Sequence, residues 1–411
     1  MNFEYVASGT SYMRMGYKES ILPEYTEIFN RHLSLIRKYC NIEGHQFSLL
    51  YNAWTETTLG ENISNHYSKS IDSIYADSGG LQIVTCGKCI TEDMKIDVYK
   101  HQSSYANYGM CFDEIPLQIL SIGGKSKRND IATRLFDITK MKHAATLTGK
   151  NITEQIKTYL IKESGCKPVL IIQGNCYETY LMWYEYVMSE VPQELHSYIG
   201  AIAISGAASG SGMLEDIERA MVYSQLNSPS NHLHLLGCGS INRMLPFIIM
   251  KKNGILQDVK ISYDSTTHTS APYQGRYFYN GGKVIDFGRN MNPKYELIYS
   301  DIKTKIPDFG LNLTEFHIAL NGPAKKHPNI SHIFESFMAI IGMSIINFVS
   351  EVNRLTNSDL IHEQKFDNNL LMLYDVKTVE DYKYWRKHIG KYVQSKKVSK
   401  VQPSLTNFLK R

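Results

Sequence analysis

Short apolar runs alternate with longer helix-like stretches over the first two thirds of the chain. Each run has four to seven residues and ends at a polar residue or a glycine. Short, nearly continuous apolar runs are typical of a parallel sheet that is buried on both faces. The pattern predicts eight strands, at 3–9, 46–52, Ser73–Ala76, Gly109–Phe112, Pro168–Ile172, Ala201–Ile204, Leu233–Leu236 and Val259–Tyr263.

The stretches between these strands carry helix signals. Several begin with an N-cap residue or an early acid, such as Thr91 and Asn151. We expect helices at Tyr25–Tyr39, Thr91–Tyr105, Ile152–Lys162, Tyr177–Val191, Gly212–Gln225 and Ile241–Lys252. Regular alternation of strand and helix over eight strands favours an α/β fold of the (β/α)8 TIM-barrel type over an open sheet.

The barrel is expected to occupy residues 1–350, with an inserted basic helical segment at about 121–150. Phe334–Val352 is strongly apolar, but it contains serine, asparagine and glutamate, which indicates a helix of the protein core. Residues 351–411 are polar and basic, and they predict a helical C-terminal extension with a loosely held end.

The composition is that of an ordinary globular protein, with 43% hydrophobic and 20% charged residues. No apolar run reaches the roughly 18 uncharged residues of a membrane span, so no membrane association is expected. No signal peptide is visible at the N-terminus. Seven scattered cysteines suggest reduced thiols, and therefore a cytoplasmic protein, or one in the host cytoplasm if the chain is viral.

The net charge is only +4, but the positive charges gather in two segments, at 125–150 and from Lys383 onward. Two basic surfaces on a nearly neutral body suggest a polyanionic partner such as a nucleic acid. Either segment alone could equally be a solvated face or a frayed tail. The candidate nucleic-acid contacts are Lys125, Lys127, Arg128, Arg386 and Lys387.

Candidate chemistry lies where the predicted strands end. Because the carboxyl ends of parallel strands meet at one rim of a barrel, residues that follow successive strands converge there. These positions recur roughly every 30 residues, the length of a βα unit, except for one longer interval that holds the basic insertion. They are Asp77, Asp113, Gln173, Gly206, Gly237 and Asp264.

Three acids, one amide and several glycines suit a guanine-like base. A carboxylate accepts from the N1–H and exocyclic amine of guanine, and an amide or a glycine N–H donates to its carbonyl. Of two further carboxylates, one could attack the anomeric carbon and the other could shuttle a proton to or from the base. The configuration at that carbon would then be retained. A single strand-end aspartate is more often a turn or N-cap residue, so the joint pattern carries the hypothesis.

Six motifs that contain these residues resemble the motifs of a known family. They are DSGGLQ at 77, FDE at 112, QG at 173, AISGAASG at 203, LLGCG at 235 and YDS at 263. With them the chain resembles the tRNA-guanine transglycosylases, and most of all the phage and bacterial branch that inserts 7-deazaguanine bases into DNA. The resemblance covers Asp77 to Gly282, about half of the chain.

The resemblance implies roles for individual residues. It makes Asp264 the nucleophile and Asp77 the general acid and base. It assigns the base pocket to Ser78, Asp113, Gln173, Ser205, Gly206, Ala207, Leu236 and Gly237. His268, in the loop after the nucleophile, could contact a phosphate or the sugar, although it could also be only a polar loop residue.

Two departures from the tRNA enzymes bear on the substrate. Those enzymes carry a zinc site of three cysteines and a histidine after the barrel, whereas this chain has no cysteine beyond Cys238. The pair Cys86 and Cys89 lies elsewhere, and a lone pair is a weak metal signal. Ser270 and Tyr273 stand where the tRNA enzymes have arginines that grip RNA. Both differences argue against a tRNA anticodon substrate.

The sequence therefore predicts a DNA guanine transglycosylase, a pentosyltransferase that needs no cofactor or metal. Its partners would be DNA and a 7-deazaguanine base, such as 7-cyano-7-deazaguanine or a derivative. One alternative is a zinc-free tRNA transglycosylase of the queuosine or archaeosine type. Others are a non-catalytic barrel subunit that binds nucleic acid, and a nucleoside hydrolase in which water resolves the intermediate.

Overall fold

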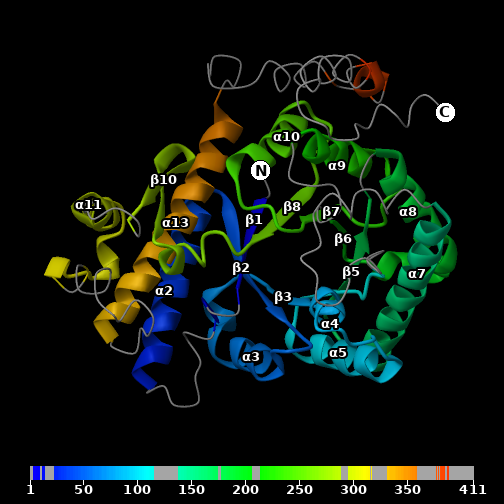
Figure 1. Ribbon diagram of the computed structural model, residues 1–411, viewed down its shortest axis with the longest axis horizontal. Helices are drawn as coiled ribbons and strands as arrows, with labels where there is room; N and C mark the ends of the chain where they lie inside the picture. Colours follow the sequence, from blue (N-terminus) through cyan, green and yellow to red (C-terminus); the bar gives the residue numbers. More distant parts are fainter. Residues whose placement is uncertain are drawn as a thin grey trace.

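A computed structural model describes most of the chain as one barrel with helices around it (Figure 1). The predicted contacts Lys125, Lys127, Arg128 and Arg386, and the predicted pocket residues Gly206 and Ala207, lie outside the described residues. The described residues are 3–9, 12–13, 23–114, 138–174, 177–205, 213–287, 295–314, 316, 331–358, 376, 378, 380–384 and 387.

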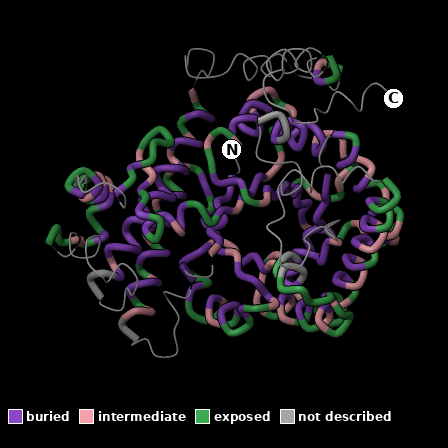
Figure 2. The backbone as a smooth tube through the Cα atoms, in the orientation of Figure 1, coloured by how far each residue is buried: buried purple, intermediate pink, exposed green. Residues whose placement is uncertain are grey.

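Eight parallel strands pair in chain order and close into a barrel. They are β1 (Phe3–Ser8), β2 (His45–Asn52), β3 (Ile74–Asp77), β4 (Tyr108–Met110), β5 (Lys167–Ile172), β6 (Ala201–Ile204), β7 (His232–Leu235) and β8 (Lys260–Ser265). The predicted TIM-type barrel is thus confirmed, and each strand lies within two residues of its expected bounds. Figure 2 shows the strands as the buried centre of the molecule.

Helices cover the outside of the barrel. Those between strands are α2 (Pro23–Ile42), α3 (Thr57–Asn62), α4 (Gly80–Thr85), α5 (Glu92–Tyr105), α7 (Ile138–Ile161), α8 (Tyr177–Glu190), α9 (Met213–Gln225) and α10 (Ile241–Lys252). The N-cap expected at Thr91 is confirmed, because its hydroxyl accepts from the Met94 N–H at 3.3 Å. Helices α3 and α4 have six residues each, too short to show a periodic pattern.

Helix α7 corrects the expected bounds of the basic insertion. The prediction placed residues up to 150 in that insertion and began the next helix at Ile152, but α7 begins at Ile138. Lysines 140, 142 and 150 make this stretch polar in sequence. Its opposite face, including Met141 and Ala145, is buried, and α7 packs along α8. The first half of α7 is therefore an amphipathic part of the barrel wall.

The eighth helix of the barrel comes late in the chain. After β8 follow a hairpin of β9 (Arg276–Tyr279) and β10 (Lys283–Asp286), then α11 (Tyr295–Lys305) and α13 (Ser331–Asn357). Helix α13 packs against α2 and α10 and so fills the gap between the first and seventh helices (Figure 1). Its apolar 18-residue window could span a membrane by length and composition, but 83% of it is buried in the protein. It continues to Asn357, beyond the expected boundary at 350.

The floor of the barrel interior is polar. Glu4 of β1 is fully buried, and its carboxylate accepts from the Tyr75 hydroxyl at 2.7 Å and from the Ser48 hydroxyl. Lys260 lies 2.7 Å from the same carboxylate and neutralises it. A buried charge that is paired and hydrogen-bonded in this way avoids most of the desolvation cost that it would otherwise carry.

The C-terminus of α7 stores backbone strain. Glu163 has a φ of 50°, a left-handed conformation that is normally taken by glycine. Its N–H donates to the Leu160 carbonyl at 3.1 Å, and the Ser164 N–H donates to the Tyr159 carbonyl at 3.0 Å. These two bonds form a Schellman cap with glutamate at the glycine position.

We predict that Glu163→Gly raises the free energy of unfolding by about 0.5–1 kcal/mol, because it removes the strain of a side chain at positive φ. Urea denaturation measures the change. Glu163→Ala is the matched control, since it removes the same carboxylate but keeps the Cβ. An equal gain from alanine would contradict a backbone origin.

Candidate functional site

A cavity of about 370 Å³ opens at the carboxyl ends of the strands, which is the rim where barrel enzymes carry their chemistry. Its wall is formed by residues of β1 to β5 and β8 and by residues that follow β4, β6 and β7. The structure brings seven of the predicted site residues to this wall. They are Asp77, Ser78, Asp113, Gln173, Ser205, Leu236 and Asp264.

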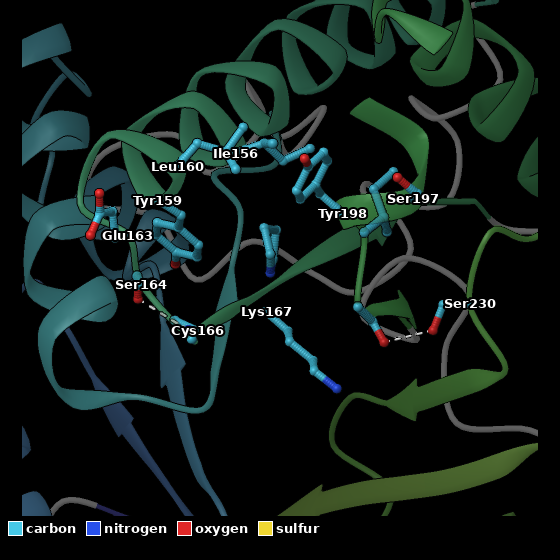
Figure 3. Close-up of a pocket in the computed structure, with 14 residues that line it drawn as sticks. Ile156, Tyr159, Leu160, Glu163, Ser164, Cys166, Lys167, Ser197, Tyr198 and Ser230 are labelled. Atoms are coloured by element: carbon cyan, nitrogen blue, oxygen red, sulfur yellow. Dashed lines mark hydrogen bonds between the residues drawn. The ribbon is translucent and has the colours of Figure 1, made fainter. Parts of the chain in front are cut away.

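A larger cavity of about 610 Å³ lies at the opposite end of the barrel (Figure 3). It is lined by the last turns of α7, the loop that leads into β5, and Ser197–Gly200 before β6. Its charged lining residues are Glu163 and Lys167, which come from opposite ends of that loop. Glycosyl chemistry needs opposed carboxylates, and of these two cavities only the smaller one is lined by more than one carboxylate.

Asp264, near the end of β8, is held firmly in place. The Gly237 N–H donates to its Oδ1 at 2.7 Å, and the Ser8 hydroxyl approaches its Oδ2 at 3.4 Å. Nε2 of His234 lies 3.6 Å from Oδ1, and the carboxylate side chain is 13% exposed. The carboxylate therefore faces the cavity with Oδ1 bound by its neighbours and Oδ2 held only by the long contact with Ser8.

Gly237 has a different place from the one predicted. The sequence assigned it to the base pocket, but it does not line the cavity; its backbone orients Asp264 instead. Its φ of 66° is left-handed, which suits glycine and turns the N–H toward the carboxylate. Leu236, which precedes it, lines the cavity as expected.

Asp77 faces the same cavity from the end of β3. Burial raises the pKa of Asp77 to about 6, and the negative charge of Asp264 adds to the rise. Hydrogen bonds from the Gly79 and Ser78 N–H groups act in the opposite direction without reversing it. A Cβ on Gly79, whose φ is 78°, would meet Asn52 Oδ1 at 2.8 Å. The glycine turn therefore lets the backbone wrap a carboxylate whose raised pKa suits proton transfer.

Asp113 and Gln173 form a pair on the far wall. The Gln173 amide donates to Oδ2 of Asp113, and both side chains are buried. Burial raises the pKa of Asp113 to about 6, the hydrogen bond from Gln173 lowers it, and the charge of Asp77 raises it further. Ser205, 4% exposed, lies beside them. A carboxylate next to an amide offers the acceptor and donor edge that a guanine-like base requires.

Sequence reasoning missed Asn52 and His234. Oδ1 of Asn52 accepts from the Trp54 and Thr55 N–H groups, both at 3.0 Å. This leaves its Nδ2 buried and, among the described residues, without a partner on the cavity wall. Asn52 is the last residue of a predicted strand, so the rim rule applied to β2 would have found it. His234 lies inside the run HLHLL, which gave only a strand signal.

His268 is not a nucleic-acid contact, contrary to the prediction. Its side chain is fully buried, and Nδ1 lies 2.9 Å from the Tyr5 hydroxyl. The ring centre is 4.6 Å from that of Phe278 and 4.5 Å from that of Phe348. His268 thus anchors the loop after β8 on α13. Lys387, the other described member of the predicted set, is exposed.

Within the described ranges, no three histidine, cysteine, aspartate or glutamate side chains are grouped closely enough to hold a metal ion. Cys86 and Cys89 are exposed free thiols. Comparison with protein-family models and with curated proteins finds no match to this chain. The functional hypothesis therefore depends on the cavity and on the motifs that line it.

We predict that Asp77→Asn stabilises the protein more at pH 8 than at pH 5. A pKa raised to about 6 means that the folded state holds its proton more tightly than the unfolded state, so stability is lost as the pH rises from the ordinary pKa of 3.8 to about 6. Asparagine cannot ionise and avoids that loss, which we place at about 1 kcal/mol after allowing for partial solvent access.

Urea denaturation at pH 5 and pH 8 measures this effect. Asp97→Asn, at an exposed position on α5, is the matched control. If Asp77→Asn stabilises the protein equally at both pH values, or more at pH 5, the raised pKa of Asp77 in the folded state would be contradicted.

Proposed function

We propose that this protein is a DNA guanine transglycosylase that replaces guanine by a 7-deazaguanine base through a covalent intermediate on Asp264. One observation carries the proposal: Asp264 and Asp77 face one cavity whose far wall holds the pair of Asp113 and Gln173. Two catalytic carboxylates and a guanine-reading edge are the parts that base exchange requires. The motif resemblance to guanine transglycosylases supports the same conclusion.

In the first half-reaction Asp264 attacks C1′ of the deoxyribose, and the bond from C1′ to the base breaks. Asp77, whose raised pKa favours its protonated form, gives its proton to the departing guanine. The base leaves neutral, and the sugar stays on Asp264 as an ester. The two carboxylates thus divide the work of nucleophile and acid.

In the second half-reaction a 7-deazaguanine enters the pocket that guanine has left. Its N9 proton passes to Asp77, and N9 attacks C1′ and displaces the Asp264 carboxylate. Two displacements on one carbon retain its configuration. Asp77 ends protonated and Asp264 ionised, as at the start, so base exchange consumes no nucleotide or reductant.

Base recognition falls to Asp113 and Gln173. The Asp113 carboxylate would accept from N1–H and the exocyclic amine, and the Gln173 amide would donate to the ring carbonyl. The hydrogen bond between the two side chains fixes their planes before the base arrives. A volume of about 370 Å³ is within the usual range of small-molecule sites. Leu236 and Ser205 line the same cavity and would border the base.

The choice of DNA depends on the loop after Asp264. From Ser265 to Gly275 the sequence contains no lysine or arginine, whereas the resembling tRNA enzymes carry arginines there. Tyr273 packs its ring 5.5 Å from that of Phe337, and the Ser270 hydroxyl accepts from Gln274 at 3.0 Å. A target base must leave its stack to enter the cavity, so single-stranded or locally opened DNA is the expected substrate.

We predict that the protein incorporates labelled guanine into DNA and that Asp264→Asn lowers this rate by roughly a thousandfold or more. The assay offers DNA and tRNA side by side, and Asp97→Asn is the matched control. Full activity of Asp264→Asn would exclude it as nucleophile. Label in tRNA alone would mean that the protein performs the same chemistry on tRNA instead of DNA. Release of free base without incorporation would indicate a hydrolase. No reaction on either polymer would indicate a barrel that only binds nucleic acid.

We also predict a bell-shaped pH dependence of kcat/KM for DNA, with its maximum near pH 6. Asp113 must lose its proton to accept two N–H groups, which gives the acid limb. Asp77 must keep its proton to release guanine, which gives the alkaline limb; the pKa of each is about 6. Initial rates between pH 4.5 and 8.5 measure the profile. A rate that keeps rising up to pH 8.5 would contradict the assignment of Asp77 as acid.

A further inference from the structure

A chain of buried polar groups stands behind Asp264 inside the barrel. His234 of β7 is fully buried, and its Nε2 points to Oδ1 of Asp264 at 3.6 Å. Within the described part of the chain, this nitrogen has no hydrogen-bond partner. Nδ1 of the same ring lies 2.8 Å from the Ser262 hydroxyl. The ring also stacks on Tyr75, with centres 5.3 Å apart and planes 23° apart, so it has little freedom to turn.

The Ser262 hydroxyl has a second imidazole neighbour, Nε2 of His232 at 2.7 Å. Burial and the nearby positive charge of Lys260 lower the pKa of His232 well below its usual range, so its ring is neutral. The Tyr75 hydroxyl lies 3.5 Å from the same Nε2, but it donates its proton to Glu4 at 2.7 Å. His232 can therefore satisfy its Nε2 by donating to Ser262.

One arrangement of protons satisfies all of these contacts. His232 donates from Nε2 to the Ser262 oxygen, and Ser262 donates to Nδ1 of His234. His234 then carries its proton on Nε2, facing the Asp264 carboxylate. The reverse arrangement would turn an imidazole lone pair toward a carboxylate oxygen, which repels it.

We propose that His234 is a positioning residue that holds Oδ1 of Asp264 and leaves Oδ2 as the attacking atom. The Gly237 N–H binds the same Oδ1 at 2.7 Å, whereas Oδ2 has only the long 3.4 Å contact with Ser8. A separation of 3.6 Å is longer than a formed hydrogen bond, and such contacts tighten when a reacting complex forms. This role rests on the proposed glycosyl exchange, but the proton arrangement does not.

Two substitutions at position 234 distinguish a hydrogen-bond donor from a residue that only packs. Leucine at 234 fills similar space without a polar atom, and glutamine presents an N–H near the position of Nε2. His234→Leu should lower kcat for guanine exchange roughly ten- to a hundredfold, the loss expected for one hydrogen bond to a charged group. His234→Gln should recover most of it. KM for the free base should stay unchanged in both, because the Asp113 and Gln173 pair is intact.

The serine relay has a matched control within the barrel. Ser262→Ala removes the proton that fixes the His234 tautomer, and kcat should fall severalfold. Ser48→Ala makes the same change at a buried serine that bonds to Glu4 instead, and it should leave kcat unchanged. Equal losses in Ser262→Ala and Ser48→Ala, or no recovery in His234→Gln, would reduce His234 to a packing residue and overturn the proposal.

A second readout does not need activity. ¹⁵N NMR of the histidine-labelled full chain reports which ring nitrogen carries the proton, and the His234 signals are those that vanish in His234→Gln. We expect the Nε2–H form in the wild type and a shift toward the Nδ1–H form in Ser262→Ala. An Nδ1–H form in the wild type would refute the arrangement. If this form is Nε2–H while no polymer is modified, the proposed function fails and the proton arrangement stands.

Discussion

Pairing of β1 with β8 is the constraint on which the site depends. The register sets Val6 beside Asp264 and Ala7 beside Ser265, and it closes the barrel at the strand that carries the proposed nucleophile. Closure turns a row of strand ends into a ring, so that residues far apart in sequence face one cavity. Helix α13 secures the same seam from outside, where Phe348 lies 6.1 Å from the ring of Tyr5 and 5.9 Å from that of Tyr263.

The ring geometry places negative charges close together, and the protein separates their roles by local surroundings. Asp264 receives a backbone N–H and lies beside a buried imidazole. Burial raises the pKa of both Asp77 and Asp113 to about 6, and the charge of Asp264 adds to the rise at Asp77 as that of Asp77 does at Asp113. Carboxyl groups whose surroundings differ in this way can serve as nucleophile, proton carrier and base reader. The division follows from burial and hydrogen bonding, since all three are aspartates.

The barrel was predictable from the sequence because each strand is a short apolar run that ends at a polar rim residue. The same rule located Asp77, Asp113, Gln173 and Asp264, which the structure brings together. It failed where a residue's role depends on distant partners. His268 looks like a polar loop residue in sequence, but Tyr5 and Phe348, from opposite ends of the chain, bury it.

The start of α7 and the bounds of the barrel escaped prediction for a related reason. Lysines along one face of α7 hid an apolar face that only α8 reveals. The eighth helix is separated from β8 by a hairpin and α11, so the strand–helix alternation that identified six of the other units is broken there. His234 was missed because an inward position on a strand has no signature of its own; its meaning comes from Asp264 on the next strand.

Mass analysis of the trapped intermediate tests the central claim most directly. The protein is mixed with a guanine-containing DNA oligonucleotide without an acceptor base, quenched in acid and digested. We expect a peptide containing Asp264 that carries the abasic strand as an ester, and that disappears when a 7-deazaguanine is added before the quench. An adduct on Asp77, or base exchange that proceeds with no adduct on Asp264, would contradict it.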